Sequence, residues 1–194
     1  MMSTEWQAIL DFWFLPADAE GYGASRTAWF KKDPAFDAQI RERFGVLIGQ
    51  ALAGGLQQWD SSPQGALARI LLLDQFTRNT LRDTPEAFSG DGLALASAQR
   101  MTAAGTDRQL LPVQRYFVYM PFMHAEDLAM QQRSLVLFRQ LYAETGEFAG
   151  ALDYAVRHHD IIAHFGRFPH RNRILGRTST AEELAFLRLP GSGF

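Results

Sequence analysis

The sequence predicts an all-α fold of about eight helices joined by short loops. Apolar residues recur at helical spacing along most of the chain, and Gly and Pro separate the periodic stretches. No stretch shows the sustained alternation and β-branched enrichment that are typical of a strand. Short loops favour antiparallel helix pairs. We therefore predict a single all-α domain over residues 1–194, with helices in antiparallel pairs and no sheet.

The first three helices carry clear signals. Near the start, apolar residues at i, i+3, i+4, i+7 and i+8 predict a helix with a wide aromatic stripe, formed by Trp6, Ile9, Leu10, Trp13 and Phe14. Asp33-Pro34 predicts an N-cap followed by proline at the first helical position, and Gly54-Gly55 predicts the end of that helix. Ser62-Pro63 opens a third helix that is apolar nearly all round, which is typical of a central, buried element.

Proline and glycine divide the middle of the chain. Thr84-Pro85 repeats the cap-then-proline start and predicts a helix that Gly105 ends. Pro121 lacks a backbone donor and clashes with the preceding turn, so we expect it to break or kink the run between Val113 and Tyr142. One helix is therefore predicted on each side of the break.

Two helices are predicted near the C-terminus. The first begins after Phe148 and should end at Gly166, with an apolar face formed by Leu152, Ala155, Val156, His159, Ile162 and Ala163. On that face His159 is expected to be a hydrogen-bonded core residue. Ser179 and Glu182 predict a capping box, because each can satisfy a free backbone N–H at a helix start. The last helix should run to about Leu189.

Composition excludes several classes of function. The chain has no cysteine, so disulfides, thiolate nucleophiles and cysteine-ligated metals are excluded. The net charge of −2 gives no general attraction to nucleic acid or to a membrane. A secretory signal pattern and an apolar run of about 18 residues are both absent, so we expect a cytoplasmic protein. Because the common nucleotide and metalloprotease motifs are also absent, we predict no cofactor and no metal.

The stretch from His158 to Arg177 is the most polar candidate surface. It holds four of the five histidines, and four arginines against the single acid Asp160, a local charge of +3. From Gly166 onward it is non-periodic, and we expect Phe168 and Leu175 to pin it to the body of the protein. A loop with apolar anchors and converging cations can form an anion site.

Three interpretations of this loop stay open. A solvated basic face is common for a run of charge, although the interleaved apolar residues indicate partial burial. Nucleic-acid binding needs a longer basic stripe and usually a basic domain. A pocket for a small anionic molecule fits best. Histidine beside arginine suits acid–base chemistry and plain binding equally well.

Two further clusters add candidate residues. Asp74 lies on the apolar face of the central helix with Arg78 one turn later, which favours an ion pair slightly over an arginine presented to an anionic ligand. The second cluster surrounds the proline break and consists of Tyr119, His124, Glu126 and Asp127. Its acids suit a helix N-terminus, and His124 with Asp127 at i, i+3 is only a weak metal signal.

Several strings resemble one known family. In chain order they are ILDFWF, LLLDQFTRN, YMPFMHAED, HHDIIAHFGRFPHRN and LGRTSTAEE, and together they resemble the bacterial family known as domain of unknown function 924. The match runs from about Ile9 to Phe186. The resemblance implies a helical fold of tetratricopeptide-like type, with helix pairs stacked in a right-handed array. It implies no established activity, cofactor or partner.

The resemblance also singles out motif positions. These are Asp74, Gln75, Arg78, Asn79, His124, Glu126, His158, Asp160, Arg167, His170, Arg171 and Asn172. His164 departs from the family pattern, in which this position looks like an arginine. A family-wide role for His164 is therefore in doubt.

The leading hypothesis is a site for a small anionic molecule. The residues expected to bind it are Arg78, Asn79, Tyr119, Arg167, Arg171 and Asn172. The histidines expected to supply hydrogen bonds or a proton are His124, His158 and His170. A supporting polar network is expected from Asp74, Gln75, Glu126 and Asp160. A rival hypothesis is a tetratricopeptide-like module that holds a protein or peptide partner. A third makes the arginines purely architectural, neutralised by Asp127 and the acids of that network.

Overall fold

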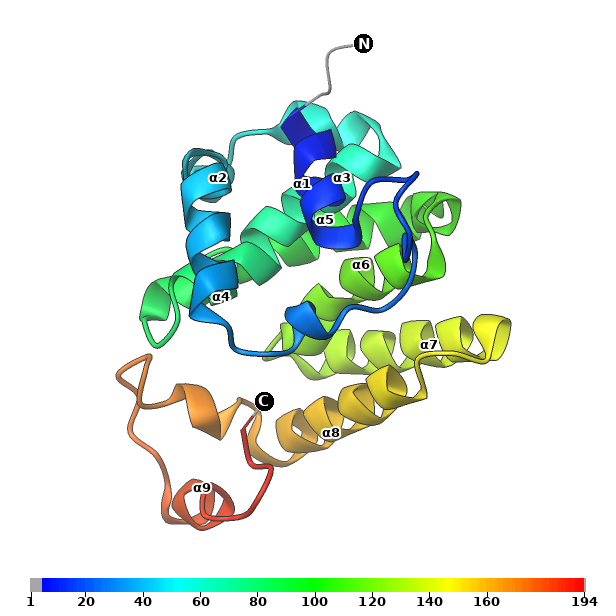
Figure 1. Cartoon of the computed structure of the whole chain (residues 1–194). Coiled ribbons are helices and arrows are strands. Elements are labelled where there is room, and N and C mark those ends of the chain that lie inside the picture. The colour runs from blue at the N-terminus through cyan, green and yellow to red at the C-terminus, as the bar shows by residue number, and fades with distance from the viewer. Residues whose placement is uncertain (1–4, 194) are drawn as a thin grey trace. The chain divides into compact units, whose positions relative to one another are not determined.

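The computed structural model describes residues 5–193, and every regular element in them is helical. When α3, η3 and α4 are counted as one continuous helix, this part of the chain contains eight helices besides short 3₁₀ turns, which confirms the predicted fold class (Figure 1). The described chain divides into two compact units. Unit 1 is Met1–Arg82 with Glu86–Pro121, and unit 2 is Asp83–Pro85 with Phe122–Phe194. The prediction of a single domain, the antiparallel pairing and the right-handed array stay predictions.

Unit 1 holds most of the helices. Its elements are α1 (Glu5–Phe14), η1 (Thr27–Trp29), α2 (Pro34–Leu52), η2 (Gln57–Ser61), α3 (Pro63–Ile70), η3 (Leu71–Phe76), α4 (Thr77–Thr80), α5 (Asp91–Ala104), η5 (Thr106–Gln109) and most of α6 (Pro112–His124). The segment η3 is π-helical, and η4 (Pro85–Phe88) is a 3₁₀ turn before α5. Every residue from Gly65 to Thr77 is buried, so the predicted central helix is confirmed.

Aromatic rings fill the core of unit 1 beside that central helix. Trp13 stacks on Trp29 with ring centroids 6.0 Å apart, and it meets Phe117 edge-on at 5.5 Å. The indole Nε1 of Trp29 donates to the carbonyl oxygen of Trp13 at 2.8 Å. Because Trp13 and Phe14 are both buried, the stripe predicted for the first helix is confirmed where it meets the core.

Unit 2 contains α7 (Leu128–Thr145), α8 (Ala149–Phe165), η6 (Pro169–Arg171) and α9 (Ala181–Phe186). Helices α7 and α8 pack against each other side by side (Figure 1). Ile161, Ile162 and Phe168 form a core cluster. Phe168 is fully buried, so it anchors the polar stretch as predicted.

Local signals set most helix ends. The Asp33 carboxylate accepts backbone N–H bonds from Ala35 and Phe36, which makes Asp33 the N-cap of α2 as predicted. Gly105 and Gly166 have φ values of +69° and +70° and end α5 and α8. Positive φ is strained for residues with a Cβ, so glycine is the residue that ends these helices with least strain.

Several predicted boundaries were wrong. Thr84-Pro85 opens only the 3₁₀ turn η4, and α5 begins six residues after Pro85, at Asp91. The capping box uses Thr180 and Glu183 instead of Ser179 and Glu182, and α9 ends at Phe186 instead of Leu189. Pro121 lies inside α6, and the break falls after His124, because a proline in the last turn removes only one late hydrogen bond.

The buried face of α8 also differs from the predicted one. Its buried positions are Ala151, Ala155, His158, Ile161 and Ile162. His158 is 4% exposed, whereas His159 is only partly buried and lies next to Asp160. The expectation that His159 is the core histidine was therefore wrong, and its neighbour takes that place.

None of the helices in residues 5–193 is long and apolar enough to cross a membrane.

Candidate functional site

Four of the predicted site residues form a cluster in unit 2, and three of them surround the buried ring of Phe168. The imidazole of His158 meets this ring edge-on at 5.4 Å between centroids, and that of His170 lies 5.6 Å away. The guanidinium carbon of Arg171 lies 4.5 Å from the ring centroid, a cation–π contact. The ring of His124 lies 6.2 Å from that of His158. We call His124, His158, His170 and Arg171 the histidine–arginine cluster.

Three separate segments supply these side chains. His124 is the last residue of α6, and His158 is on the buried face of α8. His170 and Arg171 belong to η6, which follows Phe168 directly. The backbone N–H of Phe168 donates to the Glu126 carboxylate at 2.7 Å, so the turn after α6 holds the start of η6 in place.

The protonation state of His158 follows from its contacts. Its Nδ1 lies 2.8 Å from the carbonyl oxygen of Tyr154, which can only accept, so Nδ1 carries the proton and Nε2 the lone pair. Burial, helped by the nearby His124, lowers the pKa of His158 to about 3, although the Tyr154 contact opposes the shift. His158 is therefore a neutral imidazole at pH 7.

His170 is held neutral in the same way. Burial and the positive charge of Arg171 lower its pKa to about 4, and the Glu126 carboxylate only partly offsets them. The cluster therefore combines the charge of Arg171 with at least two uncharged imidazoles, which can each donate one hydrogen bond and accept another.

An ion pair between Arg177 and Glu126 lies next to the cluster and contacts the backbone of Phe168. Arg177 binds Glu126 with both terminal nitrogens, at 2.6 and 2.9 Å, and it also donates to the carbonyl oxygen of Phe168. Burial of Glu126 opposes its charge, but hydrogen bonds from Arg177 and Phe168 outweigh burial and keep its pKa below the usual value. Glu126 thus joins the loop to the turn after α6.

Arg167 and Asn172 contact another carboxylate. Arg167 binds Glu183 through two nitrogens at 2.6 and 2.8 Å, and Asn172 Nδ2 donates to Glu183 and to Ser179. The Arg167 hydrogen bond is the main reason why the pKa of Glu183 falls to about 2. Glu183 also completes the capping box of α9, so this one carboxylate joins the loop to the last helix.

Unit 1 holds its own group of predicted residues. Asp74 is fully buried in η3, and its carboxylate accepts a hydrogen bond from Gln75 Nε2. Arg78 lies 3.3 Å from Asp74 and binds Asp91 with two nitrogens at 2.7 and 2.9 Å. Burial opposes the charge of Arg78, but the two carboxylates outweigh it and hold its pKa above the usual value.

Asn79 and Tyr119 also belong to unit 1, and both bind buried acids. Asn79 Nδ2 donates to Asp37 at 2.7 Å. The Tyr119 hydroxyl donates to Asp107 at 2.6 Å and accepts from Arg115 at 3.1 Å. Burial and the bond to Asp107 raise the pKa of Tyr119. These contacts give both residues a role in the core of unit 1.

The remaining predicted residues make surface contacts or cap a helix. Asp160 is exposed and contacts His159, while the exposed His164 contacts Glu182 at 2.8 Å. Asp127 accepts the backbone N–H of Met130 as the N-cap of α7. Within residues 5–193, no group of three or more histidine, aspartate or glutamate side chains has the arrangement needed to hold a metal ion.

Sequence reasoning missed Glu183 and Asp91, two acids that bind predicted arginines. Glu183 had a usable signal, because reading the capping box from Thr180 places a glutamate at its third position. Asp91 lies 13 residues after Arg78 and is the first residue of α5, so no local pattern connects the two residues.

These features define an all-α protein with a buried histidine–arginine cluster. Residues 9–191 match the family model described as bacterial protein of unknown function (DUF924), so the chain belongs to this family. It is similar to the solved structure of a protein of unknown function from Agrobacterium tumefaciens, with 38% identity and a TM-score of 0.82. That match covers 94% of this chain and 96% of the other. Among curated proteins, none matches this chain.

Proposed function

We propose that this protein binds a small anionic ligand through the histidine–arginine cluster of unit 2. The observation that carries the proposal is the cluster of one buried guanidinium and three imidazoles from three separate segments. Arg171, His158 and His170 surround the ring of Phe168, and His124 lies beside His158. A guanidinium offers a planar fork of donors to a carboxylate or phosphate. The imidazoles of His158 and His170 add uncharged donors and acceptors for the rest of the ligand.

The positions of the loop arginines support this role for Arg171. Arg167 and Arg177 each bind a carboxylate with two nitrogens and join the loop to Glu183 and Glu126. The buried guanidinium of Arg171 lies over the ring of Phe168, which also meets the rings of His158 and His170. The ligand-binding role that the sequence predicted for three arginines of the protein is proposed chiefly for Arg171, because its guanidinium shares this ring with two imidazoles.

The pKa values favour binding over acid–base catalysis. A general base or acid works best when its pKa lies near the working pH. His158 and His170 have pKa values of about 3 and 4, so neither exchanges protons readily at pH 7. We therefore propose a binding site in which these imidazoles donate and accept hydrogen bonds without changing charge.

A thermal-shift screen with inorganic phosphate, nucleotides and small carboxylates tests the proposal. A ligand present at 100 times its Kd adds about 2.7 kcal/mol of stability, which is a readily measured rise in Tm. We expect at least one anion to raise the Tm of the wild type. The rise should be lost in Arg171→Gln and reduced in His170→Asn.

The matched control is Arg173→Gln, which removes an exposed arginine of the same loop. It should keep the full ligand-induced rise in Tm. If Arg171→Gln does not fold, the decision rests on His170→Asn, checked by circular dichroism. A screen in which no anion raises the Tm would refute the proposal and favour the alternative of a helical module for a protein partner. A rise that is equal in wild type, Arg171→Gln and His170→Asn would also refute it.

A further inference from the structure

Unit 1 contains a hollow that has no part in the proposed anion site. Its volume is about 470 Å³, and it is lined by Ser25, Arg26, Thr27, Phe30 and Lys31. Ligand sites in proteins commonly measure about 300–1,000 Å³ and combine apolar surface with a few polar groups. This hollow therefore has the size and the mixture of groups that a small organic ligand needs.

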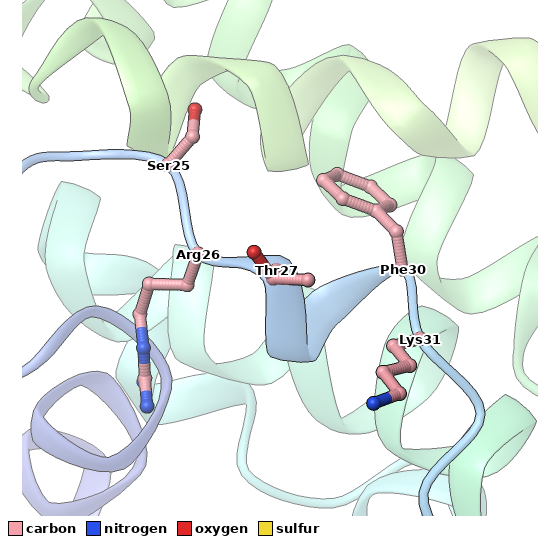
Figure 2. A pocket seen from close by; sticks show the side chains of 5 residues that line it. All are labelled: Ser25, Arg26, Thr27, Phe30 and Lys31. Carbon is pink, nitrogen blue, oxygen red and sulfur yellow. The ribbon is translucent and has the colours of Figure 1, made fainter.

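The lining has two chemically different sides. Ser25 and Phe30 extend to one side of Thr27, whereas Arg26 and Lys31 extend to the other (Figure 2). The ring of Phe30 is 62% exposed, which leaves a large apolar face in water. The side chains of Ser25, Thr27 and Lys31 are also exposed. An apolar ring beside hydroxyls and an ammonium group suits a ligand with one apolar end and one anionic end.

Hydrogen bonds to the end of α1 hold the segment that carries these residues. Arg26 donates to the carbonyl oxygens of Phe12 and Trp13, both at 2.7 Å, at the C-terminal end of α1. Trp29 donates to the same Trp13 oxygen at 2.8 Å. These bonds fix the lining before a ligand arrives, which lowers the entropy cost of binding.

The Phe30 ring is held as well, by contacts with two neighbouring rings. It forms T-shaped pairs with Tyr116 and Trp29, with centroids 6.0 and 6.2 Å away. Phe30 is still 62% exposed despite these contacts, so part of its ring is open to stacking by a planar group.

The charged residues near Lys31 favour an anionic group at the end of the ligand that lies away from Phe30. Lys31 and Lys32 are both exposed. The neighbouring acid, Asp33, is engaged as the N-cap of α2, where its carboxylate accepts the N–H groups of Ala35 and Phe36. Arg26 directs its Nη1 donor to backbone oxygens, so Lys31 is the cation of the lining that is best placed to meet an anionic group.

We propose that this hollow binds a small aromatic carboxylate, with its ring on Phe30 and its carboxylate on Lys31. The proposal is independent of the histidine–arginine cluster, since none of its lining residues belongs to unit 2.

Three probes separate the two ends of the ligand. Phenylacetate carries both ring and charge, phenylacetamide lacks the charge, and acetate lacks the ring. Titration of ¹⁵N-labelled protein, followed by amide shifts, gives the place and the Kd of binding. We expect phenylacetate to shift the amides of residues 25–31 and to bind more tightly than either of the other probes.

Variants then test the two contacts. Phe30→Ala should weaken phenylacetate binding by about tenfold, because it removes the stacking platform. Lys31→Gln should weaken it by about threefold, since an exposed ion pair contributes modestly. Lys32→Gln is the matched control and should leave the Kd unchanged. All three positions are exposed, so the fold should persist, which circular dichroism checks.

Several outcomes would overturn the proposal. One is that phenylacetate shifts amides outside residues 25–31. Another is that acetate or phenylacetamide binds as tightly as phenylacetate. A third is that Phe30→Ala or Lys31→Gln leaves the Kd of phenylacetate unchanged. Arg171→Gln, or His170→Asn if that variant does not fold, separates this site from the anion site. Either variant should keep phenylacetate binding at this hollow, whatever the fate of the anion proposal.

Discussion

His158 and His170 are neutral at pH 7 because their surroundings penalise a positive charge. His158 is 4% exposed, and Arg171 lies near both rings. An unfolded chain exposes both imidazoles, which then titrate near pH 6.5. Below that pH the unfolded state binds protons that the folded state excludes. Stability is therefore greatest above pH 6.5 and falls as the pH drops towards 4 and 3.

We predict that His158 lowers the stability of the protein in mild acid. With a folded pKa of about 3 and an unfolded value of 6.5, it should reduce the free energy of unfolding by about 2 kcal/mol between pH 7 and pH 5. Urea unfolding of wild type and His158→Asn at both pH values measures this. The difference between the two pH values should shrink by about that amount in the variant.

The choice of pH values and a control variant at His159 make this test specific to His158. Carboxylates whose pKa is lowered by folding, such as Glu126 and Glu183, destabilise the protein mainly below pH 4.5, so they contribute little between pH 7 and pH 5. His159→Asn changes the adjacent, partly exposed imidazole and should behave like the wild type. An identical pH dependence in His158→Asn would contradict the prediction.

The arginines of the loop have different roles although they look alike in the sequence. Arg167 and Arg177 bind Glu183 and Glu126, which supports the architectural interpretation for these two. The guanidinium of Arg171 lies over the ring of Phe168, which also meets the rings of His158 and His170. Sequence patterns name residue types, but only the packed structure shows which side chains each arginine meets.

At the level of the helix, close backbone contacts decide where glycine is required. A Cβ at Gly90 would lie 2.2 Å from the carbonyl oxygen of Leu73, whereas a Cβ at Gly92 would meet nothing within 4 Å. Gly90 precedes α5 and Gly92 is its second residue. The start of α5 is therefore packed directly against the backbone of the π-helical segment.

We predict opposite effects for two alanine substitutions at this place. Gly90→Ala should destabilise the protein by about 3 kcal/mol, because the helix must move away from Leu73. Gly92→Ala should stabilise it by about 0.5 kcal/mol through its helix propensity. Chemical unfolding measures both effects. Equal stabilities of the two variants would show that α5 does not pack on η3 in this way.

The capping box shows how a local motif can be ambiguous by one residue. Ser179 and Thr180 are each followed three residues later by a glutamate, so both fit the pattern. Thr180 and Glu183 form the box because the Glu183 carboxylate also binds Arg167 and Asn172. Tertiary contacts of the glutamate thus select one of two equivalent local starts.

The buried face of α8 was ambiguous for a related reason. Alanines at 151 and 155 are buried, whereas the larger Leu152 and Val156 are only partly buried. Small side chains carry a weak hydrophobic signal, so the pattern favoured the face with larger residues. These two alanines share the buried face with His158, so His158 faces inward instead of His159.

In the molecule as a whole, burial is concentrated in the central helix of unit 1. All residues from Gly65 to Thr77 are buried, while most residues of the segments 16–28 and 187–193 are exposed or partly exposed. Amide hydrogens exchange slowly where opening disrupts many buried contacts. The distribution of burial therefore predicts a gradient of local stability along the chain.

We predict that amides within Gly65–Thr77 are among the slowest to exchange with deuterium, and that those of 16–24 and 187–193 are among the fastest. Exchange followed by mass spectrometry of proteolytic peptides measures both. Helix α9 is short and its outer face is exposed, so it should exchange faster than α3. Protection of α9 equal to that of α3 would contradict this expectation.

The sequence was sufficient for the fold class, most helix boundaries and the residue types of the candidate site, because helical periodicity, caps and chain breakers act over a few neighbouring residues. Tertiary structure alone decided which histidine faces inward and which carboxylate neutralises each arginine. Glu183 is 16 residues from Arg167, and Glu126 is 51 residues from Arg177. Charge pairing depends on distance in space, and no spacing in the sequence encodes contacts that form only when helices pack.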